Sequence, residues 1–175
     1  IVQRSREVSN KLTLGVKNLL NKNKVKVLVG NAKISNIITN QHKVVIETAK
    51  DNVEVSANNI VIATGARPKT LKNIDTENKN IWSYKEAMTP NKIPDSLVIV
   101  GSGAIGIEFA SFYNDMGSEV IVIESEKNIL PAEDKEISNY AKNLFVKRGI
   151  KIFNNYSIQS IKYKKNKVIS TIKTD

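Results

Sequence analysis

The chain has 175 residues, of which 41% are hydrophobic and 25% are charged, a balance ordinary for one globular domain or for parts of two. No run approaches the roughly 18 apolar residues that a transmembrane helix needs, and the polar opening IVQRSREVSNKL does not resemble a signal peptide. A net charge of +10 would suit nucleic-acid binding, but the lysines are dispersed and arginine is scarce, which favours general enrichment in lysine.

The N-terminal half is predicted to combine one helix with a small antiparallel sheet. Apolar residues recur at helical spacing from Val8 to Leu19, which predicts a helix over about residues 4–20. The pattern then changes to the alternation typical of strands, broken by polar turns. Strands of a meander are expected at residues 25–29, 33–38, 43–48 and 53–57, followed by a buried strand at 59–65. His42 is predicted to be an exposed hairpin residue.

The second half has a different pattern. Residues 66–96 contain three of the four prolines and are predicted to form a connector with a short helical patch near residues 84–88. Beyond them, helices are expected at 107–116 and 134–148, and strands at 97–100, 119–124, 150–153, 157–163 and 168–172. This alternation predicts a parallel α/β sheet and places a domain boundary near residue 92, between residues 1–92 and 93–175.

The glycine turn GSGAIG fits the pattern G-x-G-x-x-G with Gly101, Gly103 and Gly106. A buried strand precedes it, a helix follows it, and a second strand ends in an acid, as the dinucleotide-binding fingerprint requires. Gly101 would permit the tight turn, Gly103 would let the pyrophosphate approach the backbone, and Gly106 would let the helix pack against the sheet. Free N–H groups and the helix dipole would then stabilise the phosphates. The alternative is a turn that merely joins a strand to a helix.

Glu124, the acid that ends the second strand, lies 18 residues after Gly106. Its carboxylate can accept hydrogen bonds from the hydroxyls of the adenosine ribose, and it would repel a 2′-phosphate. No arginine lies among the residues that follow it, SEKN, so the expected cofactor is NAD and not NADP. The alternative for Glu124 is an exposed acid at the end of a strand.

Chemistry that depends on thiols or metals has no support in this sequence. The absence of cysteine excludes disulfides and thiolate catalysis within these residues and fits a cytoplasmic protein. No cluster of histidine and cysteine has the spacing of a metal site, so no metal is expected.

Several motifs together resemble the dihydrolipoamide dehydrogenase group of the flavin- and NAD-dependent disulfide oxidoreductase family. IPDSLVIVGSGAIGIEFASFYNDMGSEVIVIE is similar to the NAD-binding fingerprint of that family, and IVIATGARP is similar to its second flavin motif. WSYKEAMTP resembles the connector between its domains, and RSREVSNKLTLGV resembles a helix of its flavin domain. The resemblance implies an α/β fold, in which part of an FAD domain (helix, antiparallel meander and strand) precedes a Rossmann-like NAD-binding βαβ domain.

The resemblance also implies cofactor roles for individual residues. Glu108, in the first turn of the helix, would lie near the nicotinamide and flavin rings, although it also suits the helix dipole. Ile158 would contact the adenosine part of NAD, and an ordinary core residue is the alternative. The expected NAD residues are Gly101, Ser102, Gly103, Ala104, Ile105, Gly106, Ile107, Glu108, Glu124 and Ile158. The expected FAD residues are Ala32, Ala63, Thr64 and Gly65, with a plain turn alanine as the alternative for Ala32.

Three parts of the family pattern are missing from this sequence: the first FAD-binding glycine motif, the redox cysteine pair and the C-terminal His–Glu pair. We therefore expect an internal fragment that is inactive alone. The resemblance implies that the parent enzyme oxidises dihydrolipoyl groups of 2-oxo acid dehydrogenase complexes through FAD and NAD⁺, works as a homodimer and is cytoplasmic or mitochondrial. The alternatives are another flavin disulfide reductase, a non-catalytic NAD-binding module and, ranked last, a basic interaction module.

Overall fold

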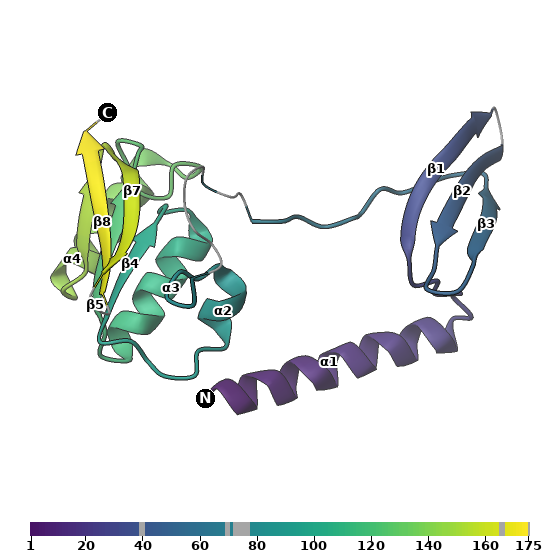
Figure 1. The fold of residues 1–175 in the computed structure, drawn as a ribbon, viewed down its shortest axis with the longest axis horizontal. Coiled ribbons are helices and arrows are strands. Elements are labelled where there is room, and N and C mark those ends of the chain that lie inside the picture. Colours follow the sequence, from purple (N-terminus) through teal and green to yellow (C-terminus); the bar gives the residue numbers. More distant parts are fainter. Residues whose placement is uncertain (39–40, 69–70, 72–77, 165–166, 175) are drawn as a thin grey trace. The chain divides into compact units, whose positions relative to one another are not determined.

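The computed structural model describes residues 1–38, 41–68, 71, 78–164 and 167–174 (Figure 1). The chain divides into two compact units, Ile1–Arg67 and Pro68–Asp175. This division follows packing, and the connector from Pro68 onward belongs to the second unit. The boundary near residue 92 concerns cofactor-binding domains and stays a prediction.

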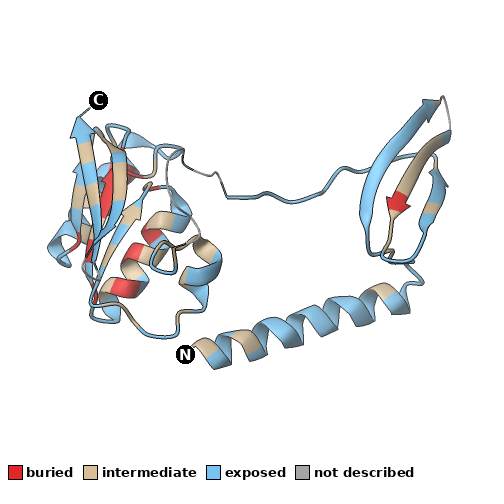
Figure 2. Ribbon diagram, in the orientation of Figure 1, coloured by how far each residue is buried: buried red, intermediate tan, exposed pale blue. Residues whose placement is uncertain are grey.

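The first unit consists of a long helix and a three-stranded antiparallel sheet, as the sequence pattern predicts. Helix α1 spans Val2–Lys22, and the sheet has the order β1-β2-β3. Its strands are β1 (Asn31–Ile38), β2 (Gln41–Glu47) and β3 (Asn52–Ala57). Burial in this unit is slight: Ile46 is its one buried residue among those described, and α1 contains none (Figure 2).

Three expectations for the first unit are wrong. Residues 25–29 form no strand, and neither do residues 59–65, where the Val61 side chain is 88% exposed. Both stretches have apolar residues of the right type, but a strand also needs a hydrogen-bonded neighbour, and no strand of the described sheet pairs with them. His42 lies in the β1–β2 hairpin as predicted, but it is not exposed: in β2, opposite Ile37, it is half-buried.

The second unit is built on the parallel sheet that the strand and helix alternation predicts. Strands β4 (Ser96–Val100), β5 (Glu119–Glu124) and β6 (Lys151–Asn154) lie in the order β4-β5-β6, and both pairings are parallel. Helix α3 (Ala104–Asp115) connects β4 to β5 and packs on both, while α4 (Lys135–Lys147) leads into β6 and packs on it. An antiparallel hairpin of β7 (Tyr156–Lys164) and β8 (Lys167–Thr174) follows, and β7 contacts β5.

The core of the second unit lies between α3 and the sheet. Ala110 and Tyr113 of α3 are fully buried against Val120 and Val122 of β5, and Ile150 completes the cluster (Figure 2). Helix α4 contributes less to this core, since Phe145 packs on it whereas other apolar side chains of the helix are exposed: Ile137, Tyr140 and Leu144. The best-packed elements are therefore α3, which follows the glycine turn, and β5.

The connector is fastened to the same core. Helix α2 (Tyr84–Met88) begins with a capping box, in which Glu86 accepts from the backbone N–H of Ser83 at 2.8 Å. The Tyr113 hydroxyl donates to the carbonyl oxygen of Ala87 at 2.6 Å, and Trp82 packs near the Tyr113 ring. Since aromatic rings add a large apolar contact area, this cluster fixes α2 on α3.

Candidate dinucleotide-binding site

The glycine turn lies where β4 passes into α3. Strand β4 ends at Val100, and Gly101 follows with φ +94°, a conformation that favours glycine. The Gly101 N–H donates to the carbonyl oxygen of Ile123 in β5 at 2.8 Å, so the turn starts while still bound to the neighbouring strand. Helix α3 then begins at Ala104, with Gly103 as its N-cap.

The three glycines meet different surroundings, which test whether the turn suits a dinucleotide. A Cβ atom on Gly106 would lie 2.1 Å from the Gly101 carbonyl oxygen, so the close packing of helix on turn requires glycine there. At Gly103 a Cβ atom would meet no protein atom within 4 Å. The chain's own packing therefore does not require glycine at 103, whereas close approach of a pyrophosphate to the backbone would. The arrangement fits a bound dinucleotide.

The N-terminus of α3 has the electrostatics of an anion site. It has no side-chain cap and no acid in its first turn. The N–H groups of a first helical turn lack intrahelical acceptors and carry the positive end of the helix dipole, so they favour a phosphate. The expectation that Glu108 lies in the first turn is wrong: α3 begins at Ala104, which places the exposed Glu108 one residue beyond that turn.

Glu124 is buried beside the turn, with only 6% of its surface exposed, so it is not the exposed strand-end acid that was the alternative. Its Oε2 atom accepts from the backbone N–H and the hydroxyl of Ser102, at 2.7 and 2.6 Å. Its Oε1 atom accepts from the Glu126 N–H at 2.8 Å and from the Ser125 hydroxyl at 3.2 Å. Burial alone raises the pKa of Glu124, but these hydrogen bonds outweigh burial and hold the pKa below its usual value. Glu124 is therefore a carboxylate at neutral pH.

The structure brings together most of the residues expected to hold NAD. The turn and the first part of α3 contain the residues from Gly101 to Glu108, and Glu124 is bonded to this turn through Ser102. Ile158 is half-buried in β7, a strand that contacts β5, and it pairs with Ile172 of β8. The sequence pattern does not reveal the contacts of the Ser102 hydroxyl, Ser125 and Glu126 with Glu124. The sequence signals for them are a serine within the turn, Ser102, and a serine directly after the strand, Ser125.

The residues expected to contact FAD lie in the first unit. Ala32 is exposed in β1, opposite Ile46 of β2. Ala63, Thr64 and Gly65 are also exposed, in a segment without regular secondary structure, and Gly65 has φ +75°. Their assignment to FAD stays a prediction.

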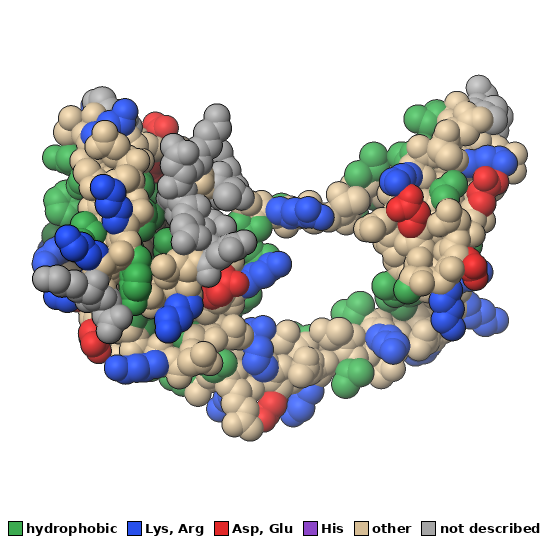
Figure 3. All heavy atoms as spheres, in the orientation of Figure 1, with side chains coloured by type: hydrophobic (Ala, Val, Ile, Leu, Met, Phe, Trp, Pro, Cys, Tyr) green, Lys and Arg blue, Asp and Glu red, His purple; other side chains and the backbone are tan. Residues whose placement is uncertain are grey.

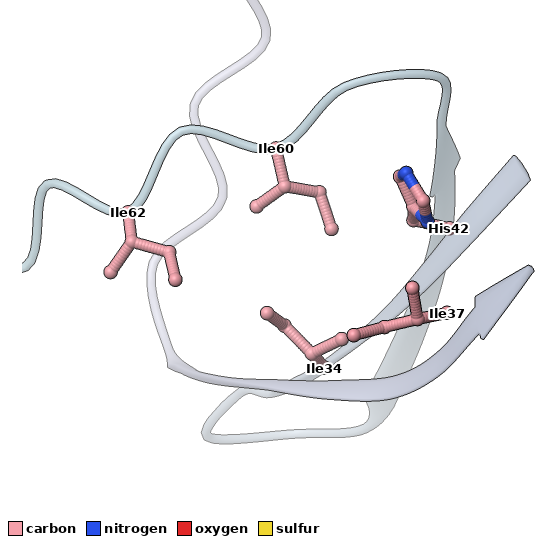
Figure 4. A pocket seen from close by; sticks show the side chains of 5 residues that line it. All are labelled: Ile34, Ile37, His42, Ile60 and Ile62. Carbon is pink, nitrogen blue, oxygen red and sulfur yellow. The ribbon is translucent and has the colours of Figure 1, made fainter. Parts of the chain in front are cut away.

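The first unit also contains a small apolar pocket, lined by His42 and four isoleucines: Ile34, Ile37, Ile60 and Ile62 (Figure 4). Two of these isoleucines come from the segment predicted as a strand, whose alternate side chains point toward β1 and β2. The Nδ1 atom of His42 is buried and has no hydrogen-bond partner among the described residues. The pocket is apolar, with one imidazole at its edge, and it lacks the charged groups that would bind a phosphate.

Lysine and arginine side chains are spread over the visible face in Figure 3, without one dominant patch. Within the described ranges, no group of three histidine, cysteine or acidic side chains is placed to hold a metal ion. None of the helices described is both long and apolar enough to cross a bilayer.

The chain matches the pyridine nucleotide-disulphide oxidoreductase family over residues 1–175. The chain belongs to this family. Among family members, it is 45% identical to the dihydrolipoyl dehydrogenase of Zymomonas mobilis, over 92% of this chain and 34% of that protein. It is 40% identical to the dihydrolipoyl dehydrogenase of Rhizobium etli, over 99% of this chain and 38% of that protein. The chain thus spans about a third of the length of these relatives.

Solved structures of the family have the same fold. LpdA from Mycobacterium tuberculosis matches with a TM-score of 0.88 and 25% identity, over 98% of this chain and 38% of that chain. The HOCl-induced flavoprotein disulfide reductase RclA from Escherichia coli matches with a TM-score of 0.77 and 27% identity, over 97% of this chain and 38% of that chain. The predicted α/β class, with an antiparallel sheet followed by a parallel one, is confirmed.

Proposed function

We propose that this chain is the part of a dihydrolipoyl dehydrogenase that contains the NAD site and a portion of the FAD domain. The observation that carries the proposal is the buried, ionised Glu124 hydrogen-bonded to a glycine turn at the uncapped start of α3. Dihydrolipoyl dehydrogenases at 45% and 40% identity support the choice within the family.

The proposed NAD site uses residues 101–108 for the pyrophosphate and Glu124 for the ribose. The backbone of the turn binds phosphate, the open space at Gly103 admits it, and the carboxylate of Glu124 accepts the ribose hydroxyls and disfavours a 2′-phosphate. Ile158 is proposed to contact the adenosine. Ala32, Ala63, Thr64 and Gly65 are proposed to contact FAD in residues 1–92, with the NAD domain in 93–175. When bound, the flavin and nicotinamide supply electron and hydride transfer, and the protein orients them.

We propose that the whole enzyme oxidises dihydrolipoyl groups carried by the lipoyl domains of 2-oxo acid dehydrogenase complexes, and that it works as a cytoplasmic homodimer. The 175 residues contain no cysteine, so the dithiol step requires residues beyond them and the chain alone is expected to be inactive. Another flavin disulfide reductase is the second candidate, supported by the fold likeness to RclA.

Two experiments test this proposal. A calorimetric titration of the 175-residue chain with NADH and, in parallel, NADPH is expected to give preferential NADH binding, which Glu124→Ala abolishes. Failure of both nucleotides to bind the folded chain would refute the NAD site. Turnover of a full-length version with NAD⁺ and dihydrolipoamide tests the substrate, and a flavin-loaded enzyme without that turnover would favour the second candidate.

A further inference from the structure

Ser102 contacts Glu124 through its side chain as well as its backbone. The residue is the first variable position in G-x-G-x-x-G, where the fingerprint itself specifies no side chain. Here its hydroxyl lies 2.6 Å from Oε2 of Glu124, and its N–H lies 2.7 Å from the same oxygen. Ser102 is fully buried and Glu124 nearly so. Two short hydrogen bonds to a charged group, shielded from water, fix one carboxylate oxygen firmly.

The other oxygen is held differently. Oε1 accepts from the Glu126 N–H at 2.8 Å and from the Ser125 hydroxyl at 3.2 Å, and Ser125 is exposed. A carboxylate has about four lone-pair positions, so the four donors fill it. The Ser125 hydroxyl makes the longest of the four bonds and can rotate into water. Replacing this bond by one from a ligand hydroxyl therefore costs less free energy than replacing any of the other three.

We propose that Ser102 is a positioning residue, whose hydroxyl anchors Oε2 of Glu124 and thereby presents Oε1 to a ribose hydroxyl of the dinucleotide. This inference rests on the proposed NAD site. It assigns the two oxygens separate roles, one structural and one for the ligand. A carboxylate fixed in this way cannot turn aside from a 2′-phosphate, so Ser102 also contributes to the preference for NADH over NADPH.

The chain offers a matched control for the loss of a buried serine hydroxyl. Ser118 is buried in the same unit, and its hydroxyl donates to the carbonyl oxygen of Pro94 at 2.6 Å and not to Glu124. Ser102→Ala and Ser118→Ala therefore remove similar hydrogen bonds at different places. Ser102→Gly is a second variant that, like Ser102→Ala, removes the hydroxyl and keeps the backbone N–H. It replaces the alanine variant if that variant does not fold.

Calorimetric titration of the folded 175-residue variants with NADH and NADPH tests the proposal. Ser102→Ala is expected to weaken NADH binding about tenfold, the effect of one hydrogen bond to a charged group, and to narrow the ratio of NADH to NADPH affinity. Ser118→Ala is expected to change neither the NADH affinity nor the ratio of the two affinities. Unchanged affinity and ratio in Ser102→Ala, or equal losses in the two serine variants, would overturn the proposal while the NAD site stands.

A measurement without ligand separates this result from failure of the NAD site. The pKa of the Glu124 carboxyl, followed by carbon NMR, is expected to rise in Ser102→Ala and Ser102→Gly and to stay unchanged in Ser118→Ala. An unchanged pKa in both Ser102 variants would refute the anchoring of Oε2. If the wild-type chain binds neither nucleotide, the proposed function itself falls, and the ribose role of Ser102 falls with it.

Discussion

A Cβ atom on Gly106 would lie 2.1 Å from the carbonyl oxygen of Gly101. The obstacle is backbone and not the end of a flexible side chain, so it can be relieved only by moving the turn away from α3. Because the turn is also bonded to β5 through the Gly101 N–H, such a movement disturbs the sheet as well. The positions of α3, the glycine turn and β5 therefore depend on one another.

Gly106→Ala is expected to destabilise the second unit by about 1–3 kcal/mol, the usual cost of overpacking a tight contact. Urea unfolding followed by Trp82 fluorescence would measure the change, since Trp82 packs against the core of this unit. A free energy of unfolding equal to that of the wild-type chain would contradict the tight fit of α3 on the turn.

Gly103→Ala is expected to impair NADH binding while changing stability little. Its φ of −64° is accessible to alanine and its Cβ position is open, so the loss of stability should stay below about 1 kcal/mol. The methyl group would occupy space needed by the pyrophosphate, and NADH affinity should fall more than tenfold. Calorimetry beside the unfolding experiment separates the two effects. A variant that binds NADH normally would show that the ligand does not approach this residue.

The carboxylate of Glu124 makes stability depend on pH. Burial raises the pKa of Glu124, but hydrogen bonds from Glu126, Ser102 and Ser125 lower it by a larger amount. The pKa in the folded chain therefore lies below the ordinary value of 4.5. A group of this kind stabilises the fold above its unfolded pKa, and the contribution is lost as pH falls through the folded pKa. Glu124→Gln should therefore cost about 1–3 kcal/mol at pH 7, and this difference from wild type should shrink below pH 4.5.

Chemical unfolding of both proteins between pH 3 and pH 7 would follow that difference. Glu133→Gln, which changes an exposed carboxylate, is the control and should stay within about 0.5 kcal/mol of wild type at pH 7. A Glu124→Gln difference that does not vary with pH would mean that the charge of Glu124 does not contribute.

Tyr113→Phe tests the attachment of the connector. The substitution removes only the hydroxyl that donates to the Ala87 carbonyl oxygen, and it should cost about 0.5–1.5 kcal/mol. Tyr140→Phe is the matched control, because Tyr140 is largely exposed on α4. Hydrogen exchange should accelerate at the amides of α2 in Tyr113→Phe and not in the control. Equal exchange rates would indicate that the ring contacts alone hold α2.

The sequence predicts best where local signals and packing agree. The glycine turn and β5 are predicted correctly, and α3 is predicted correctly except that it begins at Ala104 and not at residue 107, because apolar runs, the spaced glycines and the terminal acid all indicate the same βαβ unit. The strand predicted at 59–65 is absent, since its residues specify an apolar extended segment but cannot supply a hydrogen-bonded neighbour. The exposure of His42 is mispredicted for a related reason: its polar neighbours suggest a solvent-exposed position, whereas its burial depends on pairing opposite Ile37 in the hairpin.

The finer structure of the site lies beyond pattern reasoning. Glu124 can be recognised from its spacing, but its burial depends on the chain after β5, where the N–H of Leu130 donates to the carbonyl oxygen of Ser102. The partition of four donors between two carboxylate oxygens depends on side-chain rotation. Neither is encoded in the period of apolar residues.

Directly after the last backbone bond between the turn and β5, from the Gly101 N–H to the Ile123 carbonyl oxygen, the Ser102 N–H donates to the side chain of Glu124 at the end of β5. The proposed cofactor preference and the attachment of the turn to β5 therefore depend on the same carboxylate group. Re-engineering the chain toward NADPH by removing the acid would also take away an acceptor for the turn. A successful design would have to introduce a neutral acceptor, such as an amide oxygen, together with any new cation.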